Sequence, residues 1–341
     1  MTATTTTARA KKKLPFVSVV IPTRNNADVL DECLKSLRAQ DYPKNNYEII
    51  IADDHSVDKT LAIAKKYKTK IVISDGPPGK QRNAGIAAAR GNIIGLIDSD
   101  CKATKNWISL GVSNFTSDAA GNVAVVGGPN LTPKVDPFLS QCIGIVSSSK
   151  ITTAAMSTRY VKDGFAAKEV DETNLVSCNM FLRKSAFNTA GKFDTKLFPN
   201  EENELMFRIK AAGYKLLYVP SLIVWHHRRN SIKKFVKQNF NYGRSRAQFL
   251  KKHNAAFKPV FIMPTLFLLG LIFGPFIGAL NSTMMLLYAV VVVLYVALIL
   301  SWGIYKASKS KNWSMVLLLP MLSFMMHMSY GLGFLIGMMK K

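Results

Sequence analysis

The chain begins with an alternation of short apolar runs and segments whose apolar positions follow a helical period. A continuous β-branched run is typical of a buried strand, and one apolar face on a longer segment is typical of a helix packed on a sheet. Strands that alternate with helices indicate an α/β fold with a mostly parallel sheet and flanking helices. The predicted strands are Val17–Ile21, Glu48–Ala52, Lys70–Ser74 and Asn92–Ile97, and the predicted helices are Asp28–Gln40, Asp58–Lys66 and Arg82–Arg90, with a loop at Asp75–Lys80.

The pattern changes near residue 259, where three long apolar blocks follow one another. These are Pro259–Leu280, Met284–Tyr305 and Trp313–Met339, and each reaches the roughly 20 residues that a membrane-spanning helix needs. We therefore predict a C-terminal transmembrane region of about three spans. Pro264 and Pro275 interrupt the first block. A kinked or partly re-entrant segment is therefore the alternative to a regular membrane-spanning helix in this block.

The composition divides the chain into four parts. Residues 1–14 are rich in threonine and lysine and lack the apolar centre of a secretory signal, so a disordered basic tail is expected. Residues 15–230 form the predicted α/β domain, residues 231–258 a basic juxtamembrane helical region, and residues 259–341 the transmembrane region.

The net charge of +24 is concentrated beside the apolar blocks. Lysine and arginine crowd the segment before the first block and the loop Lys306–Lys311, whereas the loop Asn281–Thr283 carries no charge. The positive-inside rule then predicts a multi-pass protein of the cell membrane with its large domain in the cytoplasm. Three spans leave the basic tail, Lys340 and Lys341, on the outer side, which goes against the rule. Nucleic-acid binding is disfavoured because no recognition motif accompanies the basic residues.

Four cysteines are scattered along the chain: Cys33, Cys101, Cys142 and Cys178. They form no CxxC motif and no Cys/His cluster in the sequence, so neither a disulfide framework nor a zinc site is indicated. Cys33 lies on the apolar face of a predicted helix and is expected in the core.

Polar groups follow three of the predicted strands directly. Pro22 to Asn25 follow the first strand, Asp53 and Asp54 the second, and Asp98-Ser99-Asp100 the fourth. Ligands bind outside the carboxyl ends of the strands in such sheets, so these groups should converge on one edge. The first strand is not followed by GxGxxG, and GxxxxGK[ST] is absent from the chain. The dinucleotide-binding Rossmann fold and the phosphate loop are therefore disfavoured.

Asp98 and Asp100 lie two residues apart at the end of an apolar strand. Two carboxylates at one point repel each other unless a cation lies between them, and Mg²⁺ or Mn²⁺ prefers oxygen ligands completed by water and phosphates. A solvated Asp-Ser-Asp turn is the alternative. The position after the fourth strand of an α/β series favours the metal site.

Five stretches, taken together, resemble the inverting glycosyltransferases of family 2, which have a GT-A fold. They are VSVVIPTRNN, IIIADDHSVDKT, GKQRNAGIAAARGNIIGLIDSD, SCNMFLRKSAFNTAGKFD and NEENELMFRIKAAGYKLLYVP, and they span Val17 to Pro220 in the family's order. The stretch WHHRRNSIKKFVKQNFNYGRSRA that follows resembles membrane-anchored members that act on polysaccharides or lipid-linked glycans.

The resemblance implies how a nucleotide-diphosphate sugar is bound. Asp53 and Asp54 match the acids that bind the base and ribose, and Arg82 matches a residue near the diphosphate. Asp100, with Asp98, matches the pair that binds the metal ion, Mg²⁺ or Mn²⁺, which stabilises the departing diphosphate. The donor-binding residues implied in this way are Pro22, Arg24, Asp53, Asp54, Arg82, Asp98, Ser99 and Asp100.

The resemblance also implies a general base and a third metal ligand. Inversion requires a base that takes the proton of the acceptor hydroxyl, and in the family this is the second acid of a Glu-Asp pair that opens a helix. Here the pair is Glu201-Glu202, with Glu202 where aspartate is usual. Both could instead be ordinary acids of a helix's first turn. His226 follows an apolar run and is the candidate third metal ligand, or one of two interfacial histidines with His227.

The resemblance therefore predicts a hexosyltransferase whose acceptor is a membrane lipid, a lipid-linked glycan or a polysaccharide. A processive synthase is less well supported, because QNFNYGRSR, from Gln238 to Arg246, lacks the tryptophan of the Gln-xx-Arg-Trp motif. A membrane-tethered, inactive module that binds nucleotide sugars is the alternative from another class, and the retained acids at 100 and 202 disfavour it. A nucleotidyltransferase is disfavoured because no glycine-rich loop with lysine follows the first strand.

Overall fold

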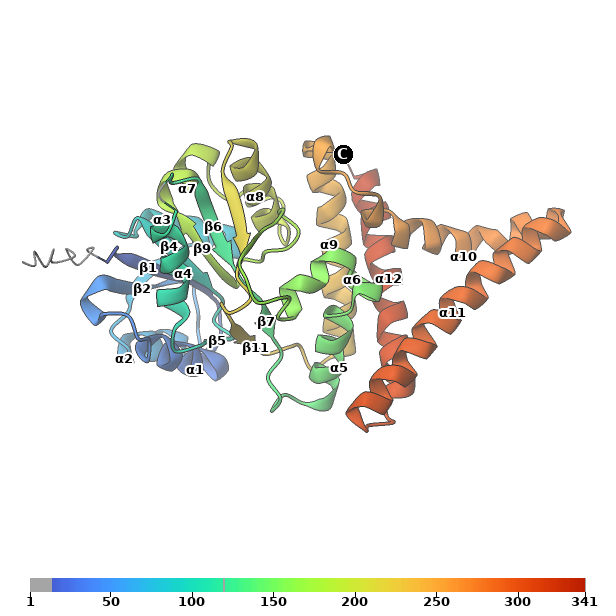
Figure 1. Cartoon of the computed structure of the whole chain (residues 1–341), viewed down its shortest axis with the longest axis horizontal. Coiled ribbons are helices and arrows are strands. Elements are labelled where there is room, and N and C mark those ends of the chain that lie inside the picture. The colour runs from blue at the N-terminus through green and yellow to red at the C-terminus, as the bar shows by residue number, and fades with distance from the viewer. Residues whose placement is uncertain (1–13, 119, 341) are drawn as a thin grey trace, which may run out of the picture.

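A computed structural model describes residues 14–118 and 120–340, so most of the predicted basic tail lies outside the described residues. Its centre is an eight-stranded sheet in the order β3-β2-β1-β4-β9-β6-β10-β8, with helices on both faces (Figure 1). A second sheet of three strands, β5-β11-β7, lies beside it. The strands are β1 (Val17–Thr23), β2 (Tyr47–Asp53), β3 (Lys70–Ile73), β4 (Ile93–Ile97), β5 (Cys101–Ala103), β6 (Val123–Gly127), β7 (Asn130–Leu131), β8 (Lys168–Glu169), β9 (Asn179–Arg183), β10 (Lys215–Tyr218) and β11 (Val224–His226).

Twelve α-helices accompany these strands in the described residues. They are α1 (Ala27–Arg38), α2 (Thr60–Lys66), α3 (Pro78–Ala87), α4 (Trp107–Thr116), α5 (Phe138–Ser147), α6 (Lys150–Thr153), α7 (Lys184–Ala190), α8 (Glu201–Ala211), α9 (Ile232–Lys252), α10 (Met263–Leu280), α11 (Ser282–Ser310) and α12 (Met315–Met339). All four predicted strands and the three predicted helices of the N-terminal half are present.

The sheet is parallel in its first half and mixed in its second. β3, β2, β1 and β4 run parallel, as predicted, whereas β9 lies antiparallel between β4 and β6. The alternation of strand and helix that signals parallel pairing stops after β4, and the sequence pattern therefore could not predict β9's direction. Because β1, β2 and β4 are parallel neighbours, their carboxyl ends meet at one edge.

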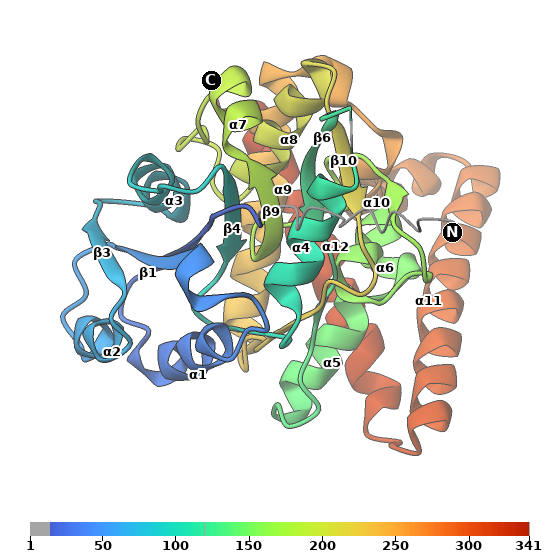
Figure 2. The same cartoon turned by 60° about the vertical axis from the view of Figure 1, so that its left-hand side comes forward.

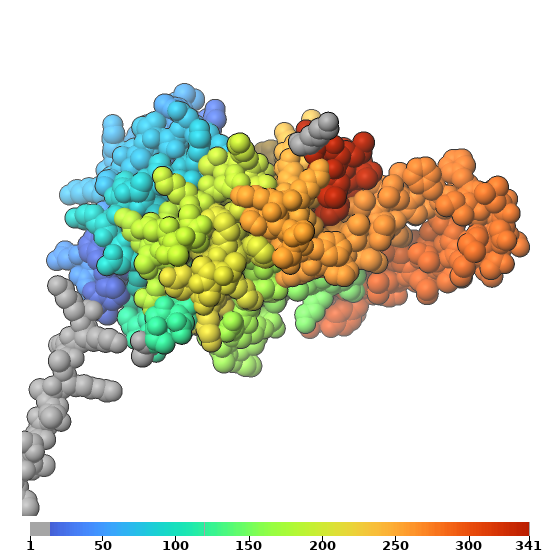
Figure 3. Space-filling model, turned by 90° about the horizontal axis from the view of Figure 1, so that it is seen from above, coloured from blue at the N-terminus to red at the C-terminus, as the bar shows by residue number. Residues whose placement is uncertain are grey.

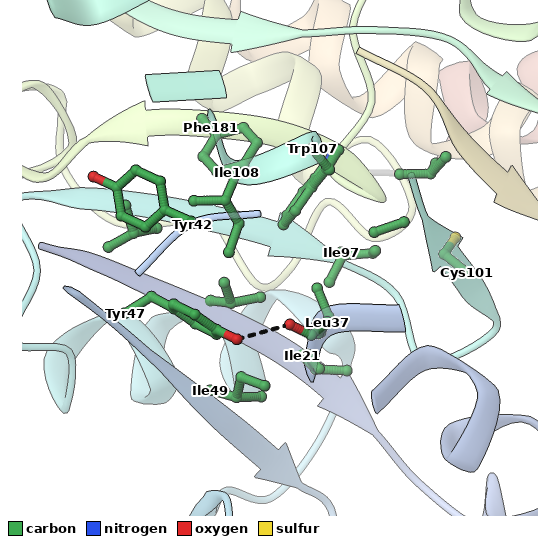
Figure 4. Packing of buried hydrophobic residues seen from close by; sticks show 14 of the residues in the cluster. Ile21, Leu37, Tyr42, Tyr47, Ile49, Ile97, Cys101, Trp107, Ile108 and Phe181 are labelled. Carbon is green, nitrogen blue, oxygen red and sulfur yellow. Dashed lines mark hydrogen bonds between the residues drawn. The ribbon is translucent and has the colours of Figure 1, made fainter. Parts of the chain in front are cut away.

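The core between the sheet and α1 and α4 is built from the apolar runs (Figure 4). Trp107 of α4 packs on Phe181 of β9 with ring centroids 4.3 Å apart, and Cys33 of α1 is 1% exposed, as predicted for a core position. The Tyr47 hydroxyl donates to the carbonyl of Leu37 at 3.0 Å, which ties the start of β2 to α1.

Some predicted boundaries were wrong. α3 begins at Pro78 and not at Arg82, because a proline fits the first turn of a helix, where no N–H partner is needed. Half of the predicted loop at 75–80 is therefore helical. α11 continues through Lys306 and Lys309 to Ser310, so the second basic loop is shorter than predicted. The helix in the first apolar block begins at Met263, with Pro264 in its first turn, and continues past Pro275.

The C-terminal part consists of the helix pair α9 and α12 next to the α/β domain and a hairpin of α10 and α11 that projects from it (Figures 1 and 3). α12 lies along α9, and three glycines make this contact close. A Cβ added at Gly243 would lie 2.0 Å from the Tyr330 carbonyl, and one at Gly333 would lie 2.0 Å from the Phe240 carbonyl. One at Gly337 would meet the carbonyl of Arg244 at 2.4 Å. Such glycines let helix backbones touch.

The three C-terminal helices are long and apolar enough to cross a membrane. In their most apolar stretches only 11% of α10 and 6% of α11 is buried inside the protein, against 44% of α12. α10 and α11 therefore expose apolar side chains over most of their surface although they contact each other, whereas α12 also packs on α9 and α5. α5 is an apolar helix that packs on the start of α12.

Candidate active site

Asp54 lies at the edge where β1 and β2 end. Thr23 and Asp53 are paired in the parallel ladder, so the residues that follow them are neighbours. The Asp54 carboxylate accepts a hydrogen bond from the backbone N–H of Gly76 at 3.1 Å and one from the Arg24 guanidinium at 2.7 Å. These two donors lower the pKa of Asp54, although partial burial opposes them. An ionised acid is thus fixed at this edge.

Asp53, Pro22 and Ser99 are buried close to Asp54. The Asp53 carboxylate is fully buried and accepts hydrogen bonds from the Ser56 backbone N–H at 2.8 Å and the Ser56 hydroxyl at 2.6 Å. Pro22 lies within β1 opposite Ala52, and Ser99 is hydrogen bonded to the Asn26 side chain at 2.5 Å. These residues shape the loops of the site, and the base and ribose role of Asp53 stays a prediction.

Arg82 connects two parts of the site. It lies on α3, is 3% exposed, and donates from Nη2 to Asp98 Oδ1 at 2.8 Å and from Nη1 to Glu201 Oε1 at 2.9 Å. Burial acts to lower the pKa of Arg82, but the Asp98 and Glu201 carboxylates raise it overall. Both ends of the guanidinium are therefore occupied by carboxylates. A bond from Arg82 to a diphosphate stays a prediction, and it requires that one of these contacts be exchanged.

Glu201 and Glu202 open α8 and are buried, with 1% and 5% exposed. Burial raises the pKa of Glu201 to about 8, assisted by the neighbouring charge of Glu202. Burial likewise raises the pKa of Glu202, against the opposing charges of Arg159 and Arg82. No side chain within residues 14–118 and 120–340 is hydrogen bonded to the Glu202 carboxylate. Glu202 thus has no side-chain partner among the described residues, whereas Glu201 has one oxygen bound to Arg82 and its Oε2 without a partner.

Asp98 and Asp100 follow β4, with side chains 31% and 41% exposed. The Asp100 Oδ2 lies 3.3 Å from His226 Nε2, and Arg228 Nη1 lies 2.9 Å from His226 Nδ1. Partial burial acts to raise the pKa of Asp100, but His226 and then Arg228 lower it overall. Two partly exposed carboxylates that lie two residues apart have the oxygen ligands that a hard divalent cation prefers.

Two cysteines that the sequence did not connect to the site lie beside Asp100. The ligand atoms of Cys101, Cys178 and His226 all lie within 4.8 Å of one another. Cys101 follows Asp100 directly, and Cys178 precedes β9. The sequence signals no Cys/His cluster, but the fold brings two cysteines and a histidine together. No sequence signal could have found this cluster, because its members come from distant segments.

α9 lies against the start of α8. The side chain of Asn200, directly before α8, donates to the Ser245 hydroxyl at 2.7 Å and to the Tyr242 carbonyl at 3.2 Å. Gln238 donates to the Tyr242 hydroxyl at 3.2 Å. The segment from Gln238 to Arg246 thus covers the helix that carries Glu202.

The predicted site residues lie on one connected edge of the α/β domain. The Asp54 carboxylate accepts a hydrogen bond from the backbone N–H of Gly76. The carbonyl of Gly76 in turn accepts one from the side chain of Gln81 at 2.9 Å, and Gln81 is the residue before Arg82. Arg82 then reaches Asp98 and Glu201. Of the predicted residues only Arg24 is largely exposed, with 64% of its side chain accessible. The edge therefore combines partly exposed acids, a buried arginine and a buried glutamate without a side-chain partner among the described residues.

This fold is a GT-A glycosyltransferase fold. Over 92% of the chain it superimposes on 86% of a mannosyltransferase from Pyrobaculum calidifontis, solved with GDP-mannose and Mn²⁺, with a TM-score of 0.56 and 14% identity. It also matches the TarS 1–349 structure of S. aureus in complex with UDP-GlcNAc, with a TM-score of 0.50 and 17% identity over 90% of each chain.

The chain belongs to glycosyl transferase family 2, whose model matches residues 18–191. One relative is a dolichyl N-acetyl-α-D-glucosaminyl phosphate 3-β-D-2,3-diacetamido-2,3-dideoxy-β-D-glucuronosyltransferase of Methanococcus voltae. The two sequences are 26% identical over 333 residues, and the alignment covers 95% of this chain and 98% of that protein. The chain is 27% identical over 275 residues to glycosyltransferase AglE of Haloferax volcanii, covering 77% of this chain and 83% of that one. The family and these relatives make the chain a glycosyltransferase that uses a nucleotide sugar.

Proposed function

We propose that the chain is a membrane-anchored, metal-dependent inverting glycosyltransferase that transfers a hexosyl group from a nucleotide-diphosphate sugar to a lipid-linked glycan. The observation that carries the proposal is the bridge of Arg82 between Asp98 and Glu201. It brings the acids after β4, which suit a cation, next to the helix that carries Glu202. A reaction that needs both a cation at a diphosphate and a base at a hydroxyl is thereby supported.

The acceptor class is supported by a relative and by the membrane helices. The Methanococcus relative matches 98% of its own length and is named for a dolichyl-phosphate-linked sugar acceptor. α9 covers the start of α8 and itself packs on α12, so the site lies close to the apolar helices. A lipid-linked acceptor would have only a short distance to cover.

Glu202 is proposed as the general base. It takes the proton of the acceptor hydroxyl while that oxygen attacks the anomeric carbon from the face opposite the diphosphate, which inverts the configuration. Its raised pKa suits a base that works near neutral pH. Glu201, which is bound to Arg82, positions the start of the helix.

Asp98 and Asp100 would hold the divalent cation, Mg²⁺ or Mn²⁺. The cation supplies Lewis-acid stabilisation of the diphosphate leaving group. His226 stays a candidate third ligand, and its Nε2 is directed at Asp100 in the described structure. Asp54, fixed by Gly76 and Arg24, is proposed for the nucleoside.

The test offers the membrane fraction a panel of nucleotide-diphosphate sugars with Mg²⁺ or Mn²⁺ and a polyprenyl-phosphate-linked sugar. We expect lipid-extractable label from one donor, its loss with EDTA, and its recovery with either ion. Asp100→Ala should abolish transfer, whereas Asp163→Ala, which removes a surface acid paired with Lys168, should not.

Two outcomes would contradict the proposal. Donor binding without transfer or hydrolysis, for every donor and acceptor, favours the inactive binding module. Transfer that continues at full rate in EDTA and in Asp100→Ala refutes the metal-dependent mechanism while leaving the family assignment intact.

A further inference from the structure

The cluster of Cys101, Cys178 and His226 has a donor set that differs from that of the acids beside it. Its three ligand atoms lie within 4.8 Å of one another. Cys101 and His226 are directly opposite in the antiparallel β5–β11 pair, and Cys178 leads into β9. Three separate strands therefore fix the cluster, and both cysteines are 2% exposed.

Sulfur and imidazole ligands select a different class of cation from carboxylates. Mg²⁺ and Mn²⁺ prefer oxygen, whereas Zn²⁺ prefers thiolate and imidazole in a tetrahedron. Zinc–sulfur bonds of about 2.3 Å place two sulfurs about 3.8 Å apart around the ion. The three ligand atoms need to approach by no more than about 1 Å to reach this spacing.

Asp100 can complete a fourth ligand position. Its Oδ2 lies 3.3 Å from His226 Nε2, and its Oδ1 lies 3.8 Å from the Cys101 sulfur. We propose that Cys101, Cys178 and His226, with Asp100, form a binding site for a thiophilic divalent cation of the Zn²⁺ class. Structural zinc sites commonly have four protein ligands of these types.

Arg228 opposes the binding of the cation. Its Nη1 lies 2.9 Å from His226 Nδ1, so a positive guanidinium faces the imidazole ring that would hold the ion. The charge of Arg228 therefore repels a cation bound to His226. Removal of the Arg228 guanidinium should therefore tighten the site.

Because the cluster includes Asp100, a cation bound in it should also affect the transfer activity. This consequence rests on the proposed function. A cation held by the two sulfurs would occupy Asp100, which the Mg²⁺ or Mn²⁺ complex of the donor also needs. The two states exclude each other, so Zn²⁺ should inhibit transfer and excess Mn²⁺ should relieve the inhibition.

The binding test uses the purified, reduced full chain without donor or acceptor. Cd²⁺ is titrated, and the ultraviolet charge-transfer band from sulfur to cadmium is recorded. We expect one saturating equivalent in the wild type and in Cys142→Ser, a buried cysteine of α5 outside the cluster. Cys101→Ser and Cys178→Ser should each lower the affinity roughly tenfold or more, and Arg228→Met should raise it.

The result does not depend on transferase activity. A band in the wild type that disappears in Cys101→Ser/Cys178→Ser supports the site even if no donor is ever found. If the wild-type chain shows no band, the proposal is wrong, whatever the variants show. The decision therefore does not depend on whether a variant folds. A band of unchanged strength and affinity in both single variants also overturns it.

Discussion

At the scale of single residues, Glu201 and Glu202 differ in the partners of their carboxylates. Both are buried at the start of α8, but Glu201 is bound to Arg82, whereas no described side chain is hydrogen bonded to the carboxylate of Glu202. We expect Glu202→Gln to lower the transfer rate by about 10²–10⁴-fold, because the amide cannot take the proton of the acceptor. Donor affinity, measured by calorimetry, should change little.

The control for this substitution is Glu169→Gln, which removes an exposed acid paired with Lys215 and should leave the rate unchanged. If Glu202→Gln keeps near-normal transfer, another group is the base. If it loses donor binding as well, Glu202 belongs to the donor pocket.

The raised pKa of Glu202 has a measurable consequence for the pH profile. The base must be ionised, so activity falls as pH decreases through its pKa. Since burial raises that pKa above the ordinary 4.5 of glutamate, the acidic limb of the rate should lie above pH 4.5. Single-turnover rates across pH measure the limb. A rate that stays constant down to pH 4.5 would exclude a buried glutamate as the base.

Single residues also show what could be predicted from the sequence. The position of Asp98 and Asp100 directly after a strand was predicted correctly because β4 is a recognisable apolar run, whereas their metal-binding role stays a prediction. The partner of Arg82 could not be predicted, since Glu201 lies 119 positions along the chain. Asp100 and Cys101 are neighbours in the sequence, but no sequence pattern predicts that Cys178 lies beside them in the fold.

At the scale of elements, the contact between α9 and α12 depends on glycines. A Cβ at position 333 would lie 2.0 Å from the Phe240 carbonyl, so the helices must separate. Gly333→Ala should cost about 1–3 kcal/mol of stability, as overpacking generally does, and it should loosen α9 from α8. Thermal unfolding measures the first effect and the rate of transfer the second.

Gly270→Ala is the matched control, because a Cβ there meets no heavy atom within 4 Å although it also lies in an apolar helix. An equal loss of stability in both variants would mean that the α9–α12 contact is not specific.

The sequence predicted α9 as a helix and α12 as an apolar helix. It could not predict that they touch, because the glycines are informative only once their partners are known.

At the scale of the whole molecule, the arrangement of the apolar helices bears on topology. α10 starts beside the end of α12, where a Cβ on Gly331 would meet the Pro264 carbonyl at 2.5 Å. α11 ends near the start of α12, where Trp302 and Ala307 pack with Met315. α10 and α11 therefore form a hairpin whose two ends return to the same side (Figures 1 and 2).

α12 connects these two ends while lying along α9. The Lys251 side chain donates to the Lys340 carbonyl at 2.6 Å, so α9 and α12 also end together. α12 packs along the basic α9 and buries 44% of its most apolar stretch inside the protein. If α12 stays on α9, we expect two crossings where the sequence predicts three, with Lys340 on the same side of the membrane as the α/β domain.

Cysteine labelling in intact cells distinguishes the two topologies. The four native cysteines are buried, so an impermeant maleimide should report mainly on introduced ones. We expect Asn281→Cys, at the turn between α10 and α11, to be labelled from outside, and Ser113→Cys of the catalytic domain only after the membrane is opened. Lys340→Cys should behave like Ser113→Cys, because the tail then avoids carrying its positive charge across the bilayer. Labelling of Lys340→Cys in intact cells would instead establish three crossings, and α12 would have to leave α9 to make the third.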